Sequence, residues 1–260
     1  MKVTILQTDV EWGRPLENIR NAERLMTQAL GADLYVLPEM WSTGFATDPV
    51  GIAEEESSSI ALEWMSKKAK ELHCAICGSV AIHVDETYRN RHYFVNGRNG
   101  MVLHYDKHHL FSYGHEDDYY TPGDKHTIVE YEEFRFLLLT CYDLRFPVWS
   151  RYSQTVPYDA ILFVSNWPES RQNAFHILTR ARAIENQAYL IACNRIGDDN
   201  YNHYRGCSAI INPIGKTLAC CKPDVQDTAT FVLDLATLEH KRTKFKVLDE
   251  RDAFCLESAL

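Results

Sequence analysis

Continuous apolar runs of strand length recur along this chain, and each ends abruptly at polar residues. The clearest run, residues 136–139, is followed at once by Thr140 and Cys141. A short uninterrupted apolar run is typical of a strand that is buried on both faces. Residues 34–37 have the same character and are closed by Pro38 and Glu39. We therefore expect buried strands whose ends present reactive side chains to a cleft.

Three longer segments, residues 15–30, 59–72 and 170–187, repeat apolar residues every three or four positions and predict amphipathic helices. In the third helix the expected inward face is Ala174, Leu178, Ala181, Ile184 and Ala188. Further strands are expected at residues 3–8, 74–84, 88–96, 101–105, 127–131, 134–140, 160–164, 188–193, 206–212, 217–221 and 228–234, and short helices after Pro147 and at 236–241. Long helices that alternate with buried strands and hairpins indicate a layered α/β domain.

Composition limits the classes of partner. The 260 residues are 45% apolar and 24% charged, which supports a substantial core and argues against disorder. The formal net charge of −9 argues against nucleic acid and anionic membranes as main partners, because both attract basic patches. No apolar run approaches the ~18 residues of a membrane span. Residues 1–9 are typical of a first strand and not of a signal peptide, so we expect a cytoplasmic protein with eight reduced cysteines.

Three positions that follow predicted strands carry groups able to act together: Glu39, Lys107 and Cys141. A thiol with an ordinary pKa is only slightly ionised at neutral pH, so a nucleophilic cysteine needs a base or a nearby cation. No histidine flanks Cys141 in the sequence. A buried carboxylate can take the thiol proton, and a lysine can stabilise the thiolate and then an oxyanion. These residues therefore indicate a catalytic thiol at position 141.

Five stretches carry a family pattern, in this order: Leu37-Pro38-Glu39-Met40 with Thr43-Gly44-Phe45, Tyr105-Asp106-Lys107-His108-His109-Leu110-Phe111, Cys141-Tyr142-Asp143-Leu144-Arg145-Phe146-Pro147, Ser165-Asn166-Trp167-Pro168, and Ala181-Arg182-Ala183-Ile184-Glu185-Asn186-Gln187. Together they resemble the nitrilase superfamily of carbon–nitrogen hydrolases over essentially the whole chain. The resemblance implies that Glu39 is the general base, Lys107 the cation and Cys141 the nucleophile. It also implies that Glu116 positions substrate or lysine, and that the Tyr142 backbone N–H helps Lys107 to hold an oxyanion.

The same resemblance implies a four-layer αββα sandwich. Two such sandwiches would stack into a homodimeric αββα–αββα block through the helix at 170–187 and the C-terminal tail. We expect one domain over residues 1–260, with 242–260 as the tail. The implied chemistry, acyl transfer through a thioester, requires no metal and no organic cofactor.

The stretches around Lys107 and Cys141 are most similar to the omega-amidase branch, which hydrolyses the terminal amide of 2-oxoglutaramate and 2-oxosuccinamate. Such substrates carry a carboxylate at the far end, so a cationic or hydroxyl-bearing group is expected in the pocket. The candidates are Arg171, His115 and Tyr113 for the carboxylate, and Phe45, Phe111 and Trp167 for apolar walls.

Other interpretations stay open. The same fold also serves nitrilases and N-carbamoyl-amino-acid amidohydrolases, and a non-catalytic interaction protein could keep it. Cys74-x-x-Cys77 invites a zinc site, but it lies in a predicted strand without a second ligand pair, so core thiols are the preferred interpretation. Asp143 and Arg145 could form an internal ion pair that shapes the turn after Cys141, or could contact the substrate directly.

Overall fold

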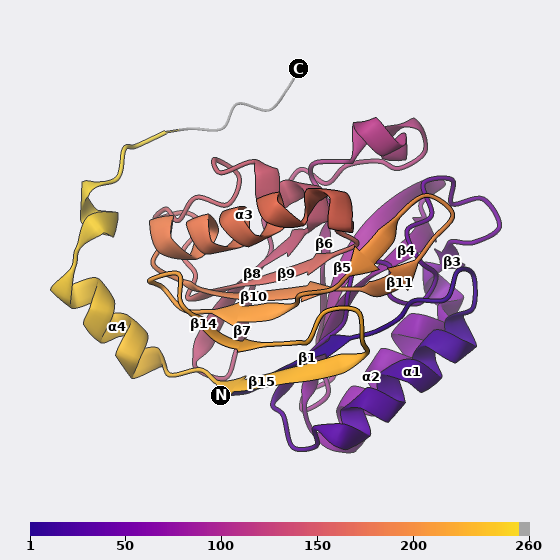
Figure 1. The fold of residues 1–260 in the computed structure, drawn as a ribbon, viewed down its shortest axis with the longest axis horizontal. Coiled ribbons are helices and arrows are strands. Elements are labelled where there is room, and N and C mark those ends of the chain that lie inside the picture. The colour runs from indigo at the N-terminus through magenta and orange to yellow at the C-terminus, as the bar shows by residue number, and fades with distance from the viewer. Residues whose placement is uncertain (255–260) are drawn as a thin grey trace.

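Two β-sheets face each other at the centre of the computed structural model, which describes residues 1–254 (Figure 1). In spatial order the first sheet contains β15 (Asp227–Val232), β1 (Lys2–Gln7), β2 (Leu34–Val36), β4 (Ala75–Val84), β5 (Thr87–Asn96) and β6 (Val102–Asp106), and β3 (Glu54–Glu55) pairs with β4. The second contains β14 (Thr217–Cys220), β13 (Ala209–Ile211), β10 (Tyr189–Asn194), β9 (Ala160–Ser165), β8 (Phe134–Thr140) and β7 (Ile128–Tyr131). A separate hairpin joins β11 (Ile196–Asp198) to β12 (His203–Arg205).

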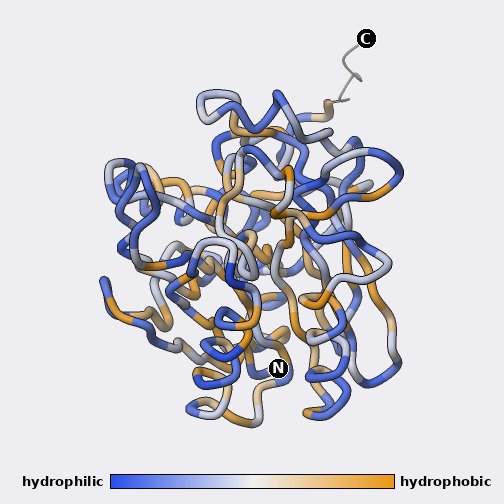
Figure 2. The backbone as a smooth tube through the Cα atoms, turned by 90° about the vertical axis from the view of Figure 1, so that its right-hand side faces the viewer, coloured by the Kyte–Doolittle hydropathy of each residue, from blue (hydrophilic) through white to orange (hydrophobic). Residues whose placement is uncertain are grey.

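The main core lies between the two sheets. Val3, Ile5 and Phe94 of the first sheet pack in one cluster with Phe136 and Leu138 of the second. Because both faces of these strands are covered, the central strands are buried at nearly every position. Figure 2 shows the hydrophobic stretches of chain running through the interior and hydrophilic stretches in many outer loops.

Helices form the two outer layers. The outer face of the first sheet is covered by α1 (Pro15–Gln28) and α2 (Ile60–Leu72), whose apolar residues form a second cluster with those of β2 and β4. The outer face of the second sheet is covered by α3 (Gln172–Glu185), which lies against β10 and β13. The last helix, α4 (Leu235–Lys244), follows β15 in the sequence. This arrangement confirms the predicted α/β fold of αββα layers (Figure 1).

Several local predictions were wrong. The most buried residues of α3 are Phe175, Thr179, Arg182 and Ala183. Of the predicted inward face, Ala174 and Leu178 pack against the core and Ala188 is buried, whereas Ile184 is 49% exposed. The apolar periodicity of this helix misled because two polar residues are buried: Thr179 bonds to the Phe175 carbonyl of its own helix, and Arg182 bonds to the Leu144 carbonyl. The short helix predicted directly after Pro147 is absent, because residues 147–150 form a turn.

Short elements complete the chain. The 3-10 helices are η1 (Glu56–Ser58), η2 (Ser112–Gly114), η3 (Glu116–Asp118), η4 (Cys141–Arg145), η5 (Glu169–Arg171) and η6 (Val247–Glu250). The predicted tail at 242–260 begins inside α4 and includes η6, and its last residues, 255–260 with Cys255, lie outside the described part. Among residues 1–254, none of the helices has the length and apolar character that a membrane-spanning helix needs.

Candidate active site

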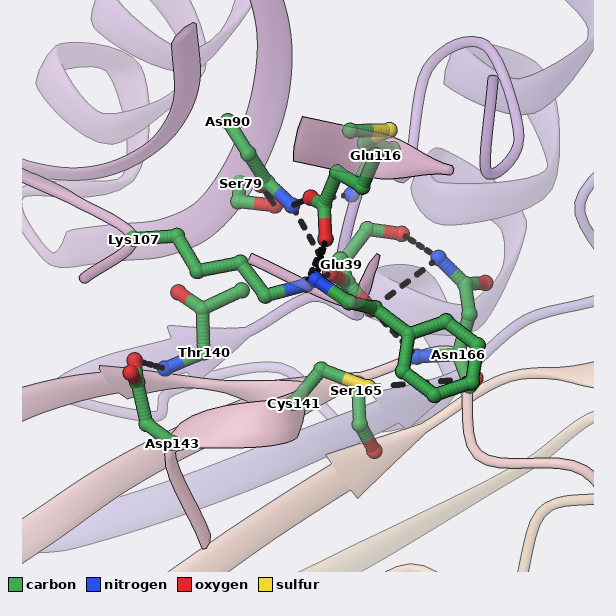
Figure 3. Close-up of polar contacts among 12 residues, drawn as sticks. Glu39, Ser79, Asn90, Lys107, Glu116, Thr140, Cys141, Asp143, Ser165 and Asn166 are labelled. Atoms are coloured by element: carbon green, nitrogen blue, oxygen red, sulfur yellow. Dashed lines mark hydrogen bonds and ion pairs between the residues drawn. The ribbon is translucent and has the colours of Figure 1, made fainter. Parts of the chain in front are cut away.

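Four polar residues lie just beyond the ends of strands and meet in the interior. Lys107 directly follows β6, Cys141 follows β8 and Asn166 follows β9, while Glu39 comes three residues after β2. Glu116 joins them from η3. Figure 3 shows these side chains converging from both sheets. The geometry therefore brings together residues that are remote in the sequence.

Lys107 lies between two carboxylates in a region closed to water. Its Nζ donates to Glu39 Oε1 at 2.9 Å and to Glu116 Oε2 at 2.7 Å, and all three side chains are fully buried. Burial acts to lower the pKa of Lys107, but the Glu116 and Glu39 carboxylates outweigh it and hold that pKa above its ordinary value. Lys107 therefore stays cationic. Burial raises the pKa of Glu116, and the charge of Lys107 opposes this rise.

The second oxygen of Glu39 is bonded to Asn166. Glu39 Oε2 accepts the backbone N–H of Asn166 at 2.8 Å, and the Asn166 side chain donates to the Glu39 backbone carbonyl at 2.8 Å. Burial raises the pKa of the Cys141 thiol, and the adjacent Glu39 carboxylate raises it further, against the opposing charge of Lys107. The resting thiol is therefore protonated, and Glu39 is placed to receive its proton.

Cys141 stands at the sharp turn where β8 becomes η4. Its backbone has φ +43°, in the left-handed region that non-glycine residues rarely adopt. The turn is held by Asp143, whose carboxylate accepts the backbone N–H of Thr140 at 3.0 Å. Tyr142 occupies the first turn of η4, where backbone N–H groups have no helical partner. This conformation exposes the cysteine to a cavity and leaves an N–H group beside it.

An asparagine and a serine that the sequence interpretation missed complete the polar cluster. Asn90, on β5, donates its Nδ2 to Glu39 Oε1 at 2.8 Å and to Glu116 Oε1 at 2.9 Å. The Ser79 hydroxyl donates to Asn90 Oδ1 at 2.8 Å (Figure 3). Both lie inside strands instead of at strand ends. For Ser79 the available signal was a polar residue in a mostly apolar strand, whereas Asn90 stands among other polar residues of β5 and gave no such signal.

A cavity with several aromatic walls opens beside Cys141. Its lining consists of Phe45, Phe111, Cys141, Tyr142, Arg145, Asn166, Trp167, Pro168, Arg171, Asn202 and Tyr204. Two guanidinium groups lie over its aromatic walls. The Arg145 Cζ is 5.0 Å from the ring centre of Trp167, and the Arg171 Cζ is 5.2 Å from that of Phe111. The cavity therefore combines apolar walls with two cations beside the thiol.

A sequence model of the carbon–nitrogen hydrolase family matches residues 2–243. The chain belongs to the carbon–nitrogen hydrolase family. This hydrolase is 40% identical to the omega-amidase YafV of Escherichia coli (strain K12) over 98% of each chain. It is 35% identical to the 2-oxoglutaramate amidase of Bacillus subtilis (strain 168), over 84% of this chain and 86% of that protein. XC1258 from Xanthomonas campestris, a CN-hydrolase superfamily protein with an arsenic adduct in its active site, matches the fold with a TM-score of 0.94, at 33% identity over 99% of both chains.

Not every pocket residue expected of this carbon–nitrogen hydrolase lines the cavity. Phe45, Phe111, Trp167 and Arg171 do, but Tyr113 and His115 do not. Tyr113 is 82% exposed, and the His115 side chain is turned to solvent, where it pairs with Asp118. The loop that carries them leaves only Phe111 and Glu116 facing inward, because these two pack against Tyr142 and Lys107 respectively.

Two further interpretations are decided by where side chains point. Asp143 does not pair with Arg145, since its carboxylate is occupied by Tyr105 and His109 and the Arg145 guanidinium turns to Trp167. Cys74 packs in the cluster under the helices, whereas Cys77 packs between the sheets. The two thiols thus lie on opposite faces of the first sheet, and no group of potential metal ligands gathers anywhere in residues 1–254.

Proposed function

We propose that this carbon–nitrogen hydrolase is a cysteine-dependent amidase acting on the terminal amide of small omega-amido 2-oxo acids, such as 2-oxoglutaramate and 2-oxosuccinamate. The products are ammonia and the dicarboxylate. The observation that carries the proposal is the buried Lys107, held between Glu39 and Glu116 next to the Cys141 thiol and the aromatic cavity. The similarity to omega-amidase YafV and to a 2-oxoglutaramate amidase supports the substrate class.

Acylation begins with a proton transfer. Glu39 takes the thiol proton as the Cys141 sulfur attacks the amide carbonyl carbon and a C–S bond forms. The tetrahedral oxyanion accepts hydrogen bonds from Lys107 and from the backbone N–H of Tyr142. Glu39 then gives its proton to the amide nitrogen, the C–N bond breaks and ammonia leaves. An acyl thioester remains on Cys141.

Deacylation uses the same groups in reverse. Glu39 removes a proton from a water molecule, whose oxygen attacks the thioester carbonyl. The second oxyanion is held by the same two donors, the C–S bond breaks, and the free acid departs. The proton returns from Glu39 to the sulfur. Each oxyanion donor of this kind typically contributes about 2.7–4 kcal/mol to lowering the barrier.

The far end of the substrate meets a cationic cavity. Arg145 and Arg171 line it, and neither guanidinium has an ion-pair partner among residues 1–254. No carboxylate belongs to the lining, so a substrate ammonium group would find no counter-ion there. A planar guanidinium suits a carboxylate because it can donate two parallel hydrogen bonds. This chemistry supports a 2-oxo acid over the corresponding amino acid.

Substrate turnover tests the proposal. The purified protein should release ammonia from 2-oxoglutaramate and little from glutamine, aliphatic nitriles or N-carbamoyl amino acids. In Arg145→Gln or Arg171→Gln the KM for 2-oxoglutaramate should rise about tenfold or more, since an ionic hydrogen bond is lost. Arg20→Gln, whose side chain lies on the exposed face of α1, is the matched control and should leave KM unchanged. Preferred turnover of a nitrile or a carbamoyl amino acid would refute the assignment.

We also propose that two copies of the chain form a homodimer through α3. This helix exposes Ile177 (57%) and Ile184 (49%), and Ile214 (63%) lies exposed on the neighbouring turn, where Gly215 packs against Ile184. Light scattering should give twice the chain mass for the natural protein and a monomer for Ile177→Glu/Ile184→Glu. A cytoplasmic location stays a prediction from the sequence.

A further inference from the structure

Asn90 bridges the same two carboxylates as Lys107 but carries no charge. The lysine donates one hydrogen bond to Glu39 and one to Glu116, and so does the Asn90 amide. Asn90 is 1% exposed and its side chain lies wholly within the polar cluster (Figure 3). Such a bridge requires both carboxylates to be acceptors at the bonded oxygens, because an amide NH2 group can only donate.

The direction of the Asn90 amide is set by a chain of hydrogen bonds. The backbone N–H of Met40 donates to Ser79 Oγ at 2.9 Å, so the Ser79 hydroxyl proton is free to point at Asn90 Oδ1. The amide oxygen therefore faces Ser79, and both amide hydrogens face the glutamates. Met40 directly follows Glu39, so the chain of bonds begins on the backbone that carries the base.

The two oxygens of Glu39 consequently have different roles. Oε1 accepts both Lys107 Nζ and Asn90 Nδ2, which leaves little room for a proton there. Oε2 accepts the Asn166 backbone N–H at 2.8 Å and has one longer contact, 3.5 Å, with the Asn166 amide nitrogen, while the Cys141 sulfur lies 3.9 Å from the Asn166 backbone carbonyl. A proton that leaves the thiol is thus directed to Oε2, from which it can reach the leaving nitrogen.

We propose that Asn90 is a positioning residue for the hydrolysis. It holds Glu39 and Glu116 at a fixed separation around Lys107 and makes Glu39 Oε2 the oxygen that carries the transferred proton. The inference deepens the proposed amidase function and rests on it. The other titratable groups that face the glutamate pair are Cys141 and Tyr120, and Tyr204 faces the sulfur.

Asn90→Asp is the sharpest variant, because it keeps the shape and the oxygen that Ser79 bonds but replaces two donors by an acceptor. We expect kcat for 2-oxoglutaramate to fall about 100-fold or more, with KM within about threefold, since the loss falls on proton transfer. The added negative charge favours the protonated carboxyls and thiol. The acidic limb of kcat/KM and the pH midpoint of Cys141 alkylation by iodoacetamide should therefore move to higher pH by about one unit.

Two further variants keep the test decisive. Ser79→Ala removes only the hydroxyl that orients the amide, and it should lower kcat about tenfold without moving KM. Asn96→Asp, on the same strand β5 and remote from the glutamates, is the matched control and should behave like the natural protein. Circular dichroism and thermal unfolding identify any variant that fails to fold.

The alkylation measurement needs no amide substrate, so it separates the two hypotheses. If the natural protein releases no ammonia from omega-amides, the proposed function fails, and the alkylation midpoint still decides the role of Asn90. If folded Asn90→Asp and Ser79→Ala keep the natural kcat and the natural alkylation midpoint, Asn90 only fills space and the inference is overturned.

Discussion

The same buried site keeps Lys107 charged and Cys141 neutral. Burial disfavours the charged form of both side chains, but at Lys107 the Glu116 and Glu39 carboxylates outweigh it. At Cys141 the same two carboxylates add to burial, so the pKa of the thiol is raised against the opposing charge of Lys107. The site therefore stores a neutral nucleophile beside a permanent cation, and ionises the sulfur only as the substrate carbonyl is attacked.

Removing the sulfur should abolish turnover and spare the fold. Cys141→Ala trims a small side chain that lines a cavity, so no closely packed space is emptied. We expect no measurable ammonia release and a melting temperature within about 2 °C of the natural protein, since the change in unfolding free energy is well under ~1 kcal/mol. Ammonia release by this variant at a tenth of the natural rate would exclude Cys141 as the nucleophile.

Removing the Lys107 ammonium should lower kcat, because the oxyanion loses a hydrogen-bond donor. In Lys107→Met the side chain keeps a similar apolar length but loses both ion pairs and the oxyanion donor. We expect kcat to fall about 100- to 1000-fold. Glu116, whose pKa is already raised, can take up a proton and limit the loss of stability. A steady-state assay combined with thermal unfolding checks both parts, and near-natural kcat would remove Lys107 from the mechanism.

At the scale of elements, Asp143 fastens the turn of Cys141 to the segment that carries Lys107. Its Oδ1 accepts the backbone N–H of His109 at 2.9 Å and lies 2.9 Å from His109 Nδ1. Its Oδ2 accepts the Tyr105 hydroxyl at 2.8 Å and the Thr140 N–H at 3.0 Å. Tyr105 is in β6 and Thr140 ends β8, so one buried carboxylate joins the two sheets behind the site.

Asp143→Asn should weaken this connection between β6 and β8. The amide replaces one acceptor oxygen by a donor that faces other donors, which costs about 1–3 kcal/mol of unfolding free energy. Because Lys107 and Cys141 then lose their common support, we expect kcat to fall at least about tenfold as well. Asp159, also buried and bonded to Arg135 and Arg242, is the matched control. Asp159→Asn should lose similar stability in urea but keep kcat, and an equal kcat loss in both variants would contradict the argument.

Periodicity in the sequence predicted the long elements well and the irregular ones poorly. The buried strands at 134–140 and 160–164 were recognisable because both faces are covered and their central residues, 136–139 and 160–164, are all apolar. The end of the strand before Cys141 was also predicted, but the conformation of the turn was not, since it depends on a left-handed residue and a hydrogen bond from Thr140 to Asp143. The inner face of α3 was misassigned because Arg182 lies inside, where it donates to the Leu144 carbonyl at 2.6 Å.

Motifs in the sequence led to the residues at strand ends but not to their supports. Glu39, Lys107 and Cys141 stand next to recognisable stretches, and the fold brings them together as the resemblance implied. Asn90 and Ser79 act across neighbouring strands, so their role depends on the register between β4 and β5, which no local pattern specifies. The same limit applies to Tyr113 and His115, whose directions depend on how one loop packs.

At the scale of the whole molecule, a neutral histidine between the sheets ties stability to pH. His92 is completely buried on β5, and its ring nitrogens have no hydrogen-bond partner among residues 1–254. Burial lowers the pKa of His92 to about 3, against the opposing effects of the Leu139 backbone and Asp143. The unfolded chain binds a proton here below pH ~6.5, whereas the folded protein does not until about pH 3. Stability is therefore complete above pH ~6.5 and falls as the pH decreases.

Replacing this histidine should flatten the acid dependence of stability. At pH 4 the proton bound by the unfolded chain costs about 3 kcal/mol of unfolding free energy. In His92→Leu, of similar volume and without a titratable group, the loss between pH 7 and pH 4 should be smaller by about that amount. Urea unfolding at both pH values measures the difference. His240→Gln, on the exposed side of α4, should match the natural protein, and identical pH dependence in all three would rule out His92 as the cause.

The pairing of β1 with β15 has a consequence for how the protein is made. Lys2 lies opposite Val232, and the Met1 amino group donates to the Leu233 carbonyl at 3.0 Å. During translation β1 must wait, with one edge unpaired, until more than two hundred further residues have been added. Nascent chains stalled before residue 227 should accordingly present that edge to chaperones, and release of the last strand should end the encounter.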